Sequence, residues 1–439
     1  MFRLNFFESK KGLETRKTSA LLPVIFLVIG IAVLNSCIED PTLPILTTSP
    51  EINLTINSIT SGGEITSDGG AAVTARGVCW GTVTNPTNEG AHTTDGVGSG
   101  IFTSNITELT TNTMYYMRAF AVNEVGVAYG NEIVFTTDAA APELTTTEVS
   151  SVSPTTATSG GNITYDGDAS ITARGICWST SPNPDLSDSF TTNGTGAGSF
   201  SSALSGLTPA TTYFVRAYAT NRAGVAYGEE ISFRTKISDI EGNLYNTVVI
   251  GTQVWMAENL RTTKYNDNIQ IPNITDETVW MNLTSSGYCW YNNNDYYKST
   301  YGALYSWYTI KEGELCPSGW HVPTDEEFNA LEIYLGMASD QVNVWGWRGA
   351  DQGAQIKSTT GWDNDGNGTN TSGFTALPGG YRAAASGSFF TMGLLTYWWT
   401  ATEHDADRGW YRRVDGTNSG IYKASTSKNG GKYIRCLKD

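Results

Sequence analysis

The stretch GGEITSDG at residues 62–69 returns 98 residues later as GGNITYDG at residues 160–167. The same offset relates ARGVCW at 75–80 to ARGICW at 173–178. A constant offset without an insertion indicates two copies of one domain in tandem. In each copy, short apolar runs alternate with Asp-Gly, Asn-Pro and Gly-rich turns, a pattern that predicts an all-β sandwich of about seven strands.

The repeat also divides the rest of the chain. The two β-domains are expected at residues 51–138 and 143–236, with a linker at 37–50 before the first. The repeat pattern ends near residue 237, which leaves 237–439 as a third domain. A chain of 439 residues has room for three domains, because a domain typically spans about 100–200 residues.

Composition excludes several classes of protein. Only 16% of the residues are charged while 47 are glycine, which argues against a coiled coil or a helical bundle. Acidic residues outnumber basic ones by 43 to 27, giving a formal net charge of −16. Phosphate backbones are held by clusters of Lys and Arg, and the cluster present here lies within the first 20 residues. No nucleic acid partner is therefore expected.

The N-terminus has the features of an export signal. Five basic residues precede an apolar run at residues 21–34, and this run is shorter than the roughly 20 residues that a membrane-spanning helix needs. The sequence LNSC at 34–37 resembles a bacterial lipobox, in which the cysteine becomes the acylated first residue. We therefore expect a lipoprotein signal peptide at 1–36 and a lipid attachment site at Cys37, with an uncleaved anchor as the alternative.

Removal of this signal leaves an acidic chain that is expected to contact the membrane through its acylated Cys37. It takes away five basic and two acidic side chains, so 403 residues with a formal charge of −19 remain. Acyl chains contribute about 0.8 kcal/mol per buried CH₂, which suffices to hold the chain to a membrane. Glu39 and Asp40 resemble the acidic pair that directs lipoproteins of Bacteroidetes-type bacteria outward. The expected location is the outer membrane, lipid-anchored at the cell surface.

The two repeats resemble a known β-domain family. Residues 207–221 (LTPATTYFVRAYATN) are similar to the fibronectin type III strand that carries a tyrosine corner. The resemblance implies that the hydroxyl groups of Tyr115 and Tyr213 return to the backbone. Strict alternation places Trp80 and Trp178 beside an arginine on one face, so either these rings are partly exposed or a bulge intervenes. We expect both domains to act as spacers.

Aromatic residues concentrate in the last part of the chain. The final 201 residues hold 11 of the 13 Trp and 15 of the 22 Tyr. Such a concentration either builds a core that supports long loops or lines a groove for stacking on sugar rings.

Six ordered sequence blocks stand out in this region: GTQVWMAENL at 251–260, YGALY at 301–305, CPSGWHVPT at 316–324, LPGGYR at 377–382, WWTATE at 398–403 and IRCLKD at 434–439. They look like successive blocks of the Fibrobacter succinogenes major paralogous domain. A further resemblance, to the C-type-lectin-like fold of formylglycine-generating enzymes, implies an α+β domain with few regular elements. The expected fold is therefore two all-β immunoglobulin or fibronectin III-like sandwiches followed by an α+β lectin-like domain.

One helix is predicted from local chemistry alone. Thr324 and Glu327 form a capping box, and Gly336 supplies a stop. The apolar stripe at helical spacing consists of Phe328, Leu331 and Leu335.

The resemblance to lectin-like folds also implies a long-range disulfide between Cys316 and Cys436. Such a bridge closes a loop of about 120 residues. Pairing of Cys289 with Cys316 is the rival arrangement. Cys79 and Cys177 occupy equivalent places in separate repeats, so they are not expected to meet.

Catalytic and metal-binding signals are sparse. The three histidines, His92, His321 and His404, lack metal-ligand spacing, and the reactive cysteine pair of formylglycine-generating enzymes is reduced here to Cys436. No catalytic residue and no cofactor is therefore expected.

One segment has oxygen-bearing residues at the spacing of a calcium loop. Asp363, Asp365 and Asn367 stand at its positions 1, 3 and 5, but Phe374 occupies position 12, where a bidentate Glu belongs. An ordinary turn is the alternative to Ca²⁺.

These patterns favour a surface protein whose C-terminal domain binds polysaccharide or a surface protein. Aromatic rings among uncharged Asn, Gly, Ser and Thr suit stacking on sugars. The candidate ligand-binding residues are Trp345, Trp347, Trp362, Trp398, Trp399 and Trp410. The alternatives are a structural envelope protein without a ligand and an enzyme on a formylglycine-generating scaffold.

Overall fold

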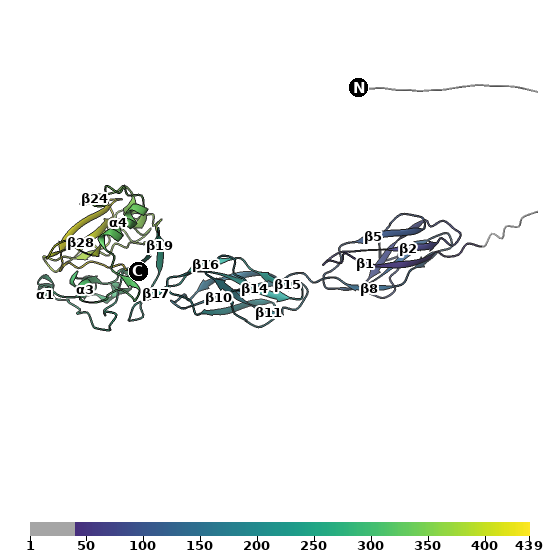
Figure 1. Ribbon diagram of the computed structural model, residues 1–439, viewed down its shortest axis with the longest axis horizontal. Helices are drawn as coiled ribbons and strands as arrows, with labels where there is room; N and C mark the ends of the chain where they lie inside the picture. Colours follow the sequence, from purple (N-terminus) through teal and green to yellow (C-terminus); the bar gives the residue numbers. More distant parts are fainter. Residues whose placement is uncertain (1–39) are drawn as a thin grey trace, which may run out of the picture.

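A computed structural model describes residues 40–439, so the predicted signal at 1–36 and Cys37 lie outside the described residues. Strands make up 40% of the structure and helices 9%, in several separate sheets. The first repeat, the second repeat and the C-terminal segment follow one another in a row (Figure 1). Within residues 40–439, the helices are all too short or too polar to cross a bilayer.

The first repeat consists of two antiparallel sheets. Its strands are β1 (Ile45–Ile52), β2 (Ile59–Ser67), β3 (Ala75–Gly81), β4 (Ala91–His92), β5 (Gly100–Ile106), β6 (Met114–Val122), β7 (Val127–Tyr129) and β8 (Ile133–Thr136). One sheet has the order β1-β2-β5, and the other has the order β4-β3-β6-β7 with β8 also paired to β6. Ile59 and Ile65 from the first sheet share a core with Val78 and Met117 from the second.

The second repeat has the same topology. Its strands are β9 (Glu143–Ser150), β10 (Thr156–Tyr165), β11 (Ala173–Ser179), β12 (Ser189–Phe190), β13 (Gly198–Ser205), β14 (Thr212–Asn221), β15 (Gly224–Tyr227) and β16 (Ile231–Arg234). Individual contacts recur at the offset of the sequence repeat. The Thr48 hydroxyl accepts the Ala119 N–H at 2.9 Å, and the Thr146 hydroxyl accepts the Ala217 N–H at 3.0 Å.

The first sheet starts earlier than the sequence analysis expects. Strand β1 begins at Ile45, inside the range 37–50 that we assigned to a linker. Leu46 and Thr48 alternate into the core, where both are buried. The run of small polar residues around them resembles a linker in composition, but its alternation of buried and exposed positions is that of an edge strand.

The tyrosines behave as predicted. The Tyr115 hydroxyl accepts the backbone N–H of Thr110 at 3.1 Å, and the Tyr213 hydroxyl accepts that of Thr208 at 3.0 Å. Each bond ties the start of a strand to the turn before it, which fixes the corner between the two sheets.

The open question of the Trp80 register has a definite answer. Strand β3 pairs with β6 from Ala75 to Gly81 without a shift, so no bulge is present. Arg76, Val78 and Trp80 therefore share the inward face, where Trp80 is partly buried against the core. Trp178 takes the same half-buried position in the second repeat.

The C-terminal segment combines small sheets with short helices. Its strands are β17 (Ile237–Ser238), β18 (Leu244–Tyr245), β19 (Thr247–Ile250), β20 (Gln253–Met256), β21 (Tyr288–Cys289), β22 (Leu304–Tyr305), β23 (Trp320–His321), β24 (Gly346–Arg348), β25 (Tyr381–Arg382), β26 (Phe389–Phe390), β27 (Leu395–Glu403), β28 (Arg408–Asp415), β29 (Ile421–Ser427) and β30 (Leu437–Lys438). Its helices are α1 (Glu277–Met281), α2 (Lys298–Tyr301), α3 (Tyr308–Glu312), α4 (Asp325–Tyr334) and α5 (Gln352–Ile356), with 3₁₀ turns η1 (Tyr291–Asn293) and η2 (Asp295–Tyr297). The two four-stranded sheets have the orders β19-β20-β30-β23 and β24-β29-β28-β27.

Helix α4 confirms the local prediction. The Thr324 side chain accepts the Glu327 N–H, and the Glu327 carboxylate accepts the Thr324 N–H at 2.8 Å, which completes the capping box. Gly336 follows the helix at φ 97°, a conformation that favours glycine. The predicted apolar stripe of Phe328, Leu331 and Leu335 is buried.

The disulfide between Cys316 and Cys436 is present, so the rival pairing through Cys289 is excluded. Cys289 is a free, fully buried thiol, and burial raises its pKa to about 12. A thiol in this environment stays protonated and unreactive at neutral pH. Cys436 is buried and bonded, so it offers no open thiol either.

Candidate functional site

The sheet β24-β29-β28-β27 has two chemically different faces. Residues opposite one another across its strands share a face. One cross-strand row contains Trp398, Arg412 and Lys423. The neighbouring row, on the other face, contains Tyr397, Arg413, Tyr422 and Trp347.

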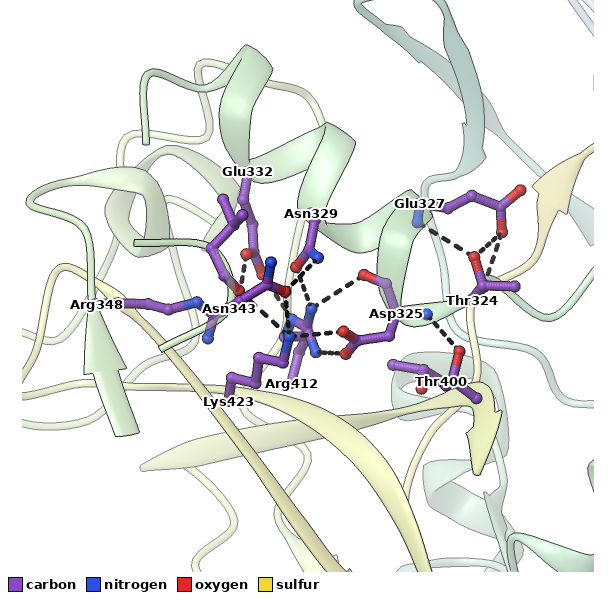
Figure 2. Close-up of polar contacts among 12 residues, drawn as sticks. Thr324, Asp325, Glu327, Asn329, Glu332, Asn343, Arg348, Thr400, Arg412 and Lys423 are labelled. Atoms are coloured by element: carbon purple, nitrogen blue, oxygen red, sulfur yellow. Dashed lines mark hydrogen bonds and ion pairs between the residues drawn. The ribbon is translucent and has the colours of Figure 1, made fainter. Parts of the chain in front are cut away.

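Helix α4 covers the first face through a buried ion network (Figure 2). Glu332 pairs with Arg348 and accepts from Arg412 Nε at 2.7 Å. Asp325 accepts from Arg412 at 2.5 Å and from Lys423 Nζ at 2.6 Å. Burial raises the pKa of the Asp325 carboxyl, but the stronger effect of Arg412 and Lys423 holds it below its ordinary value. Every charge here has a partner, so this face is structural.

The second face carries a continuous series of aromatic rings, which we call the aromatic track. From one end to the other it consists of Phe390, Tyr381, Tyr397, Tyr411, Tyr422 and Trp347. Successive ring centroids lie 5.8, 4.9, 5.2, 6.4 and 5.2 Å apart. Phe390 is 43% exposed at one end, and Trp347 is half-buried at the other. The track therefore offers ring surface to solvent.

Two cations lie against these rings. The Arg413 guanidinium is 4.9 Å from the Trp347 ring and 4.8 Å from the Tyr422 ring, and it pairs with Asp415 at 2.7 Å. Lys432 Nζ is 4.4 Å from the Tyr397 ring, and it has three further rings around it. Cation–π contacts of this kind stabilise the charged forms.

An open cavity of about 520 Å³ lies where Lys432 and Tyr381 meet. Its volume is within the range of small-molecule sites. Besides these two residues, its wall includes Met281, Thr426, Ser427 and Asn429. The aromatic track, its two cations and this cavity together form the candidate site.

The structure removes three of the predicted tryptophans from the surface. Trp398 and Trp399 are fully buried, and Trp362 is 5% exposed. Their indole N–H groups donate inside the protein. The acceptors are Asn259 Oδ1 for Trp398 at 2.9 Å, the Tyr305 carbonyl for Trp399 at 2.9 Å and Ser358 Oγ for Trp362 at 3.0 Å. These three side chains build the core and do not line a ligand surface.

The other three predicted tryptophans divide between the two faces. Trp347 belongs to the aromatic track. Trp345 is 51% exposed and contacts Trp410 at 4.6 Å, with His404 beside both rings. Trp410 lies in the same strand face as Arg412, so this second aromatic cluster is on the side of the sheet that α4 covers.

The predicted calcium segment forms a turn. The Gly366 N–H donates to the Asp363 carbonyl at 3.0 Å, and Asp365 has a φ of 56°. Asn367 Oδ1 accepts the Trp362 N–H at 3.1 Å. Nowhere in residues 40–439 do three or more His, Cys, Asp or Glu side chains come together as a metal site. Asp-Gly and Asn-Gly dipeptides favour turns, because Asp and Asn bond to the nearby backbone and Gly tolerates positive φ angles.

His321 links the start of α4 to the chain terminus. Its Nε2 is 2.9 Å from Glu327 Oε1, and its Nδ1 is 2.6 Å from Asp439 Oδ1. Burial lowers the pKa of His321, but hydrogen bonds to Asp439 and Glu327 outweigh this and raise it above its ordinary value. Two carboxylates around one ring are satisfied together by the imidazolium form.

We expect His321 to stabilise the protein at acidic pH. Its folded pKa is raised, so its contribution is complete below the unfolded pKa of about 6.5 and is lost as the pH rises through the folded value. Denaturant unfolding of the protein and of His321→Gln should differ more at pH 5.5 than at pH 8.5. An equal difference at both pH values would contradict the role of the imidazolium.

Sequence analysis predicted Trp347 and missed the other five residues of the aromatic track. It singled out tryptophans, whereas four of the six rings are tyrosines, and it assigned no role to Arg413 or Lys432. A signal was present, because Tyr397 with Trp399 and Tyr411 with Arg413 alternate along neighbouring strands. Alternation of large side chains marks one face of a strand, although it does not tell which face is open.

The sequence blocks of the C-terminal segment meet in its core. Asn259 accepts from Trp398 and from Arg435, and Cys436 is bonded to Cys316. The blocks therefore maintain the fold, and the block at 377–382 also supplies Tyr381 to the aromatic track. Comparison with curated proteins finds no match to this chain. The segment at residues 248–438, which contains the track and the disulfide, matches the family model of the Fibrobacter succinogenes major domain.

Proposed function

We propose that this protein is a lipid-anchored protein of the cell surface whose C-terminal segment binds polysaccharide along the aromatic track. The observation that carries this proposal is the run of six rings along one face of the sheet and the adjoining strands β25 and β26, with Phe390 exposed at one end and Trp347 half-buried at the other. Aromatic faces stack on the apolar faces of sugar rings, and neighbouring polar groups bond their hydroxyls. A track longer than one ring suits a polymer better than a single sugar.

In this proposal, the two repeats are fibronectin III-like spacers between the membrane and the binding segment. The tyrosine bonds to Thr110 and Thr208 and the two packed sheets of each repeat support that assignment. Their place between the N-terminal region and the C-terminal segment is consistent with a spacer (Figure 1). For the C-terminal segment, helix α4 and the Cys316–Cys436 bridge support a lectin-like fold.

Truncation of rings on the track is expected to weaken polysaccharide binding. Trp347→Ala and Tyr422→Ala should each reduce affinity by about two- to tenfold, because a single aromatic contact contributes about 0.5–1.5 kcal/mol. The matched control is Trp345→Ala, which removes an exposed ring from the other side of the sheet and should leave affinity unchanged. Binding is measured first on a glycan array and then by titration of the retained polysaccharide.

Three outcomes would count against the proposal. If the protein retains no polysaccharide on the array, the proposed function is wrong. If Trp345→Ala loses binding and the track variants do not, the binding site lies on the other face of the sheet. Capture of a cell-surface protein in place of any glycan would replace polysaccharide recognition with protein recognition.

A further inference from the structure

Lys432 is held under the aromatic track by its backbone. Its N–H donates to the Tyr305 carbonyl at 3.1 Å, and its carbonyl accepts the Tyr305 N–H at 2.9 Å. The residue is 4% exposed, and it forms part of the wall of the 520 Å³ cavity. The amine is therefore fixed at the point where the track and the cavity join.

Lys432 differs from all other buried cations in the described part of the chain. Each of the others donates to at least one oxygen of the protein. These residues are Arg348, Lys357, Arg382, Arg412, Lys423, Lys428 and Arg435. Lys432 has rings around it and no carboxylate within 4.0 Å. Aromatic faces attract an ammonium group. Unlike an oxygen atom, they offer no lone pair that accepts a hydrogen bond from its three N–H groups.

The charges around Lys432 are also unbalanced. Burial is the main cause that lowers the pKa of Lys432 to about 7, Arg413 contributes to the same shift, and no acid opposes them. The titratable and charged groups that face it are Tyr381, Tyr397, Tyr411 and Arg413. Arg382 also lines the cavity, and its guanidinium donates to the carbonyls of Gly387 and Thr275. Burial raises the pKa of Tyr397 and of Tyr411, so both phenols stay neutral through the physiological range. Asp415 is already paired with Arg413 at 2.7 Å.

We propose that the cavity beside Lys432 takes an anionic group of the bound polysaccharide, a carboxylate or a sulfate, which accepts from the Lys432 ammonium. This inference rests on the proposed function and narrows it to acidic polysaccharides. An anion in the cavity supplies a charged acceptor that the protein does not provide, and it offsets the repulsion between Lys432 and Arg413. A neutral sugar supplies hydroxyl acceptors but leaves the two positive charges unbalanced.

Binding of such an anion is coupled to protonation of Lys432. The free protein holds the amine partly neutral near pH 7, and an anion binds the ammonium form, so binding takes up a proton. Affinity should be highest below pH 7 and fall by about tenfold per pH unit as the pH rises above that value. The bound anion raises the pKa of Lys432, and the affinity stops falling once the pH exceeds this raised pKa of the complex.

The test uses oligogalacturonate and its fully methyl-esterified form, which share a backbone and differ in charge. At pH 6, the affinity of the full chain for the acid form should exceed its affinity for the ester by about tenfold or more. Calorimetry in two buffers of different ionisation enthalpy should show proton uptake with the acid form at pH 7.5. A sulfated galactan and its desulfated form distinguish sulfate from carboxylate in the same way.

Lys432→Met should bind the acid form and the ester equally and should lose the pH dependence. The matched control is Lys311→Met, which removes an exposed lysine and should behave as the unchanged protein. Proton uptake is measured on the unchanged protein, so it tests the inference even if Lys432→Met does not fold. Equal affinity for charged and esterified forms without proton uptake would overturn the inference and leave polysaccharide recognition standing. Binding of no polysaccharide at all would overturn both.

Discussion

Replacing Glu332 by glutamine is expected to lower the free energy of unfolding of the C-terminal segment by about 3–5 kcal/mol. Glu332 is fully buried and shared by Arg348 and Arg412 (Figure 2). A neutral amide leaves both guanidinium groups in the interior with Asp325 as the remaining carboxylate of the network. Denaturant unfolding followed by tryptophan fluorescence measures this segment, because 11 of the 13 Trp lie in the last 201 residues.

The control for Glu332 lies on the same helix. Glu326 is exposed, so Glu326→Gln should change the free energy of unfolding by no more than about 0.5 kcal/mol. Combining Glu332→Leu with Arg348→Leu should cost less than the sum of the two single changes, since the pair is removed together. A cost below about 1 kcal/mol for Glu332→Gln would show that the network is not tightly buried.

Removing the disulfide is expected to have an effect of similar size. The bridge joins residues 120 apart, and in the loop-entropy model closing such a loop stabilises by about 3–5 kcal/mol. For a segment of this length, the melting temperature of Cys316→Ala/Cys436→Ala should fall by on the order of 10 °C. Differential scanning calorimetry of the purified protein gives this shift directly.

Reduction of the unchanged protein is the control for the cysteine variant. A reducing agent should lower its melting temperature towards that of the double variant and leave the double variant unaffected. Peptide mapping should find Cys289 unmodified by alkylating agents until the protein unfolds, because that thiol is fully buried. A mapped bond between Cys289 and Cys316 would contradict the structure.

Features that depend on neighbours in sequence were predicted well. The capping box at Thr324 rests on a local pattern, and the tandem repeat on direct identity at a constant offset. The hydroxyl bonds of Tyr115 and Tyr213 followed from the resemblance to a fibronectin type III strand. The start of β1 at Ile45 was missed because small polar residues suit both a linker and an edge strand. The Cys316–Cys436 bridge followed from a family resemblance, since spacing alone left two pairings open.

The candidate site depends on contacts that no local pattern encodes. Trp398 and Trp399 are adjacent and point to opposite faces of β27, yet both are fully buried, because the sheet is covered on both sides at that point. The Lys432 ammonium contacts the rings of Tyr381, Tyr397 and Tyr411, which lie on three different strands. Such a cage exists only after the strands assemble.

The last strand of the chain lies directly beside one of the first strands of the C-terminal segment. Trp255 of β20 pairs with Leu437 of β30, and the Met256 N–H donates to the Cys436 carbonyl at 3.0 Å. If the C-terminal segment binds a polymer as proposed, a pull from the amino side reaches β20 after β17, β18 and β19. Strand β20 is paired with the strand that follows the Cys316–Cys436 bond, so separating the two strands would break backbone hydrogen bonds next to a covalently fixed position.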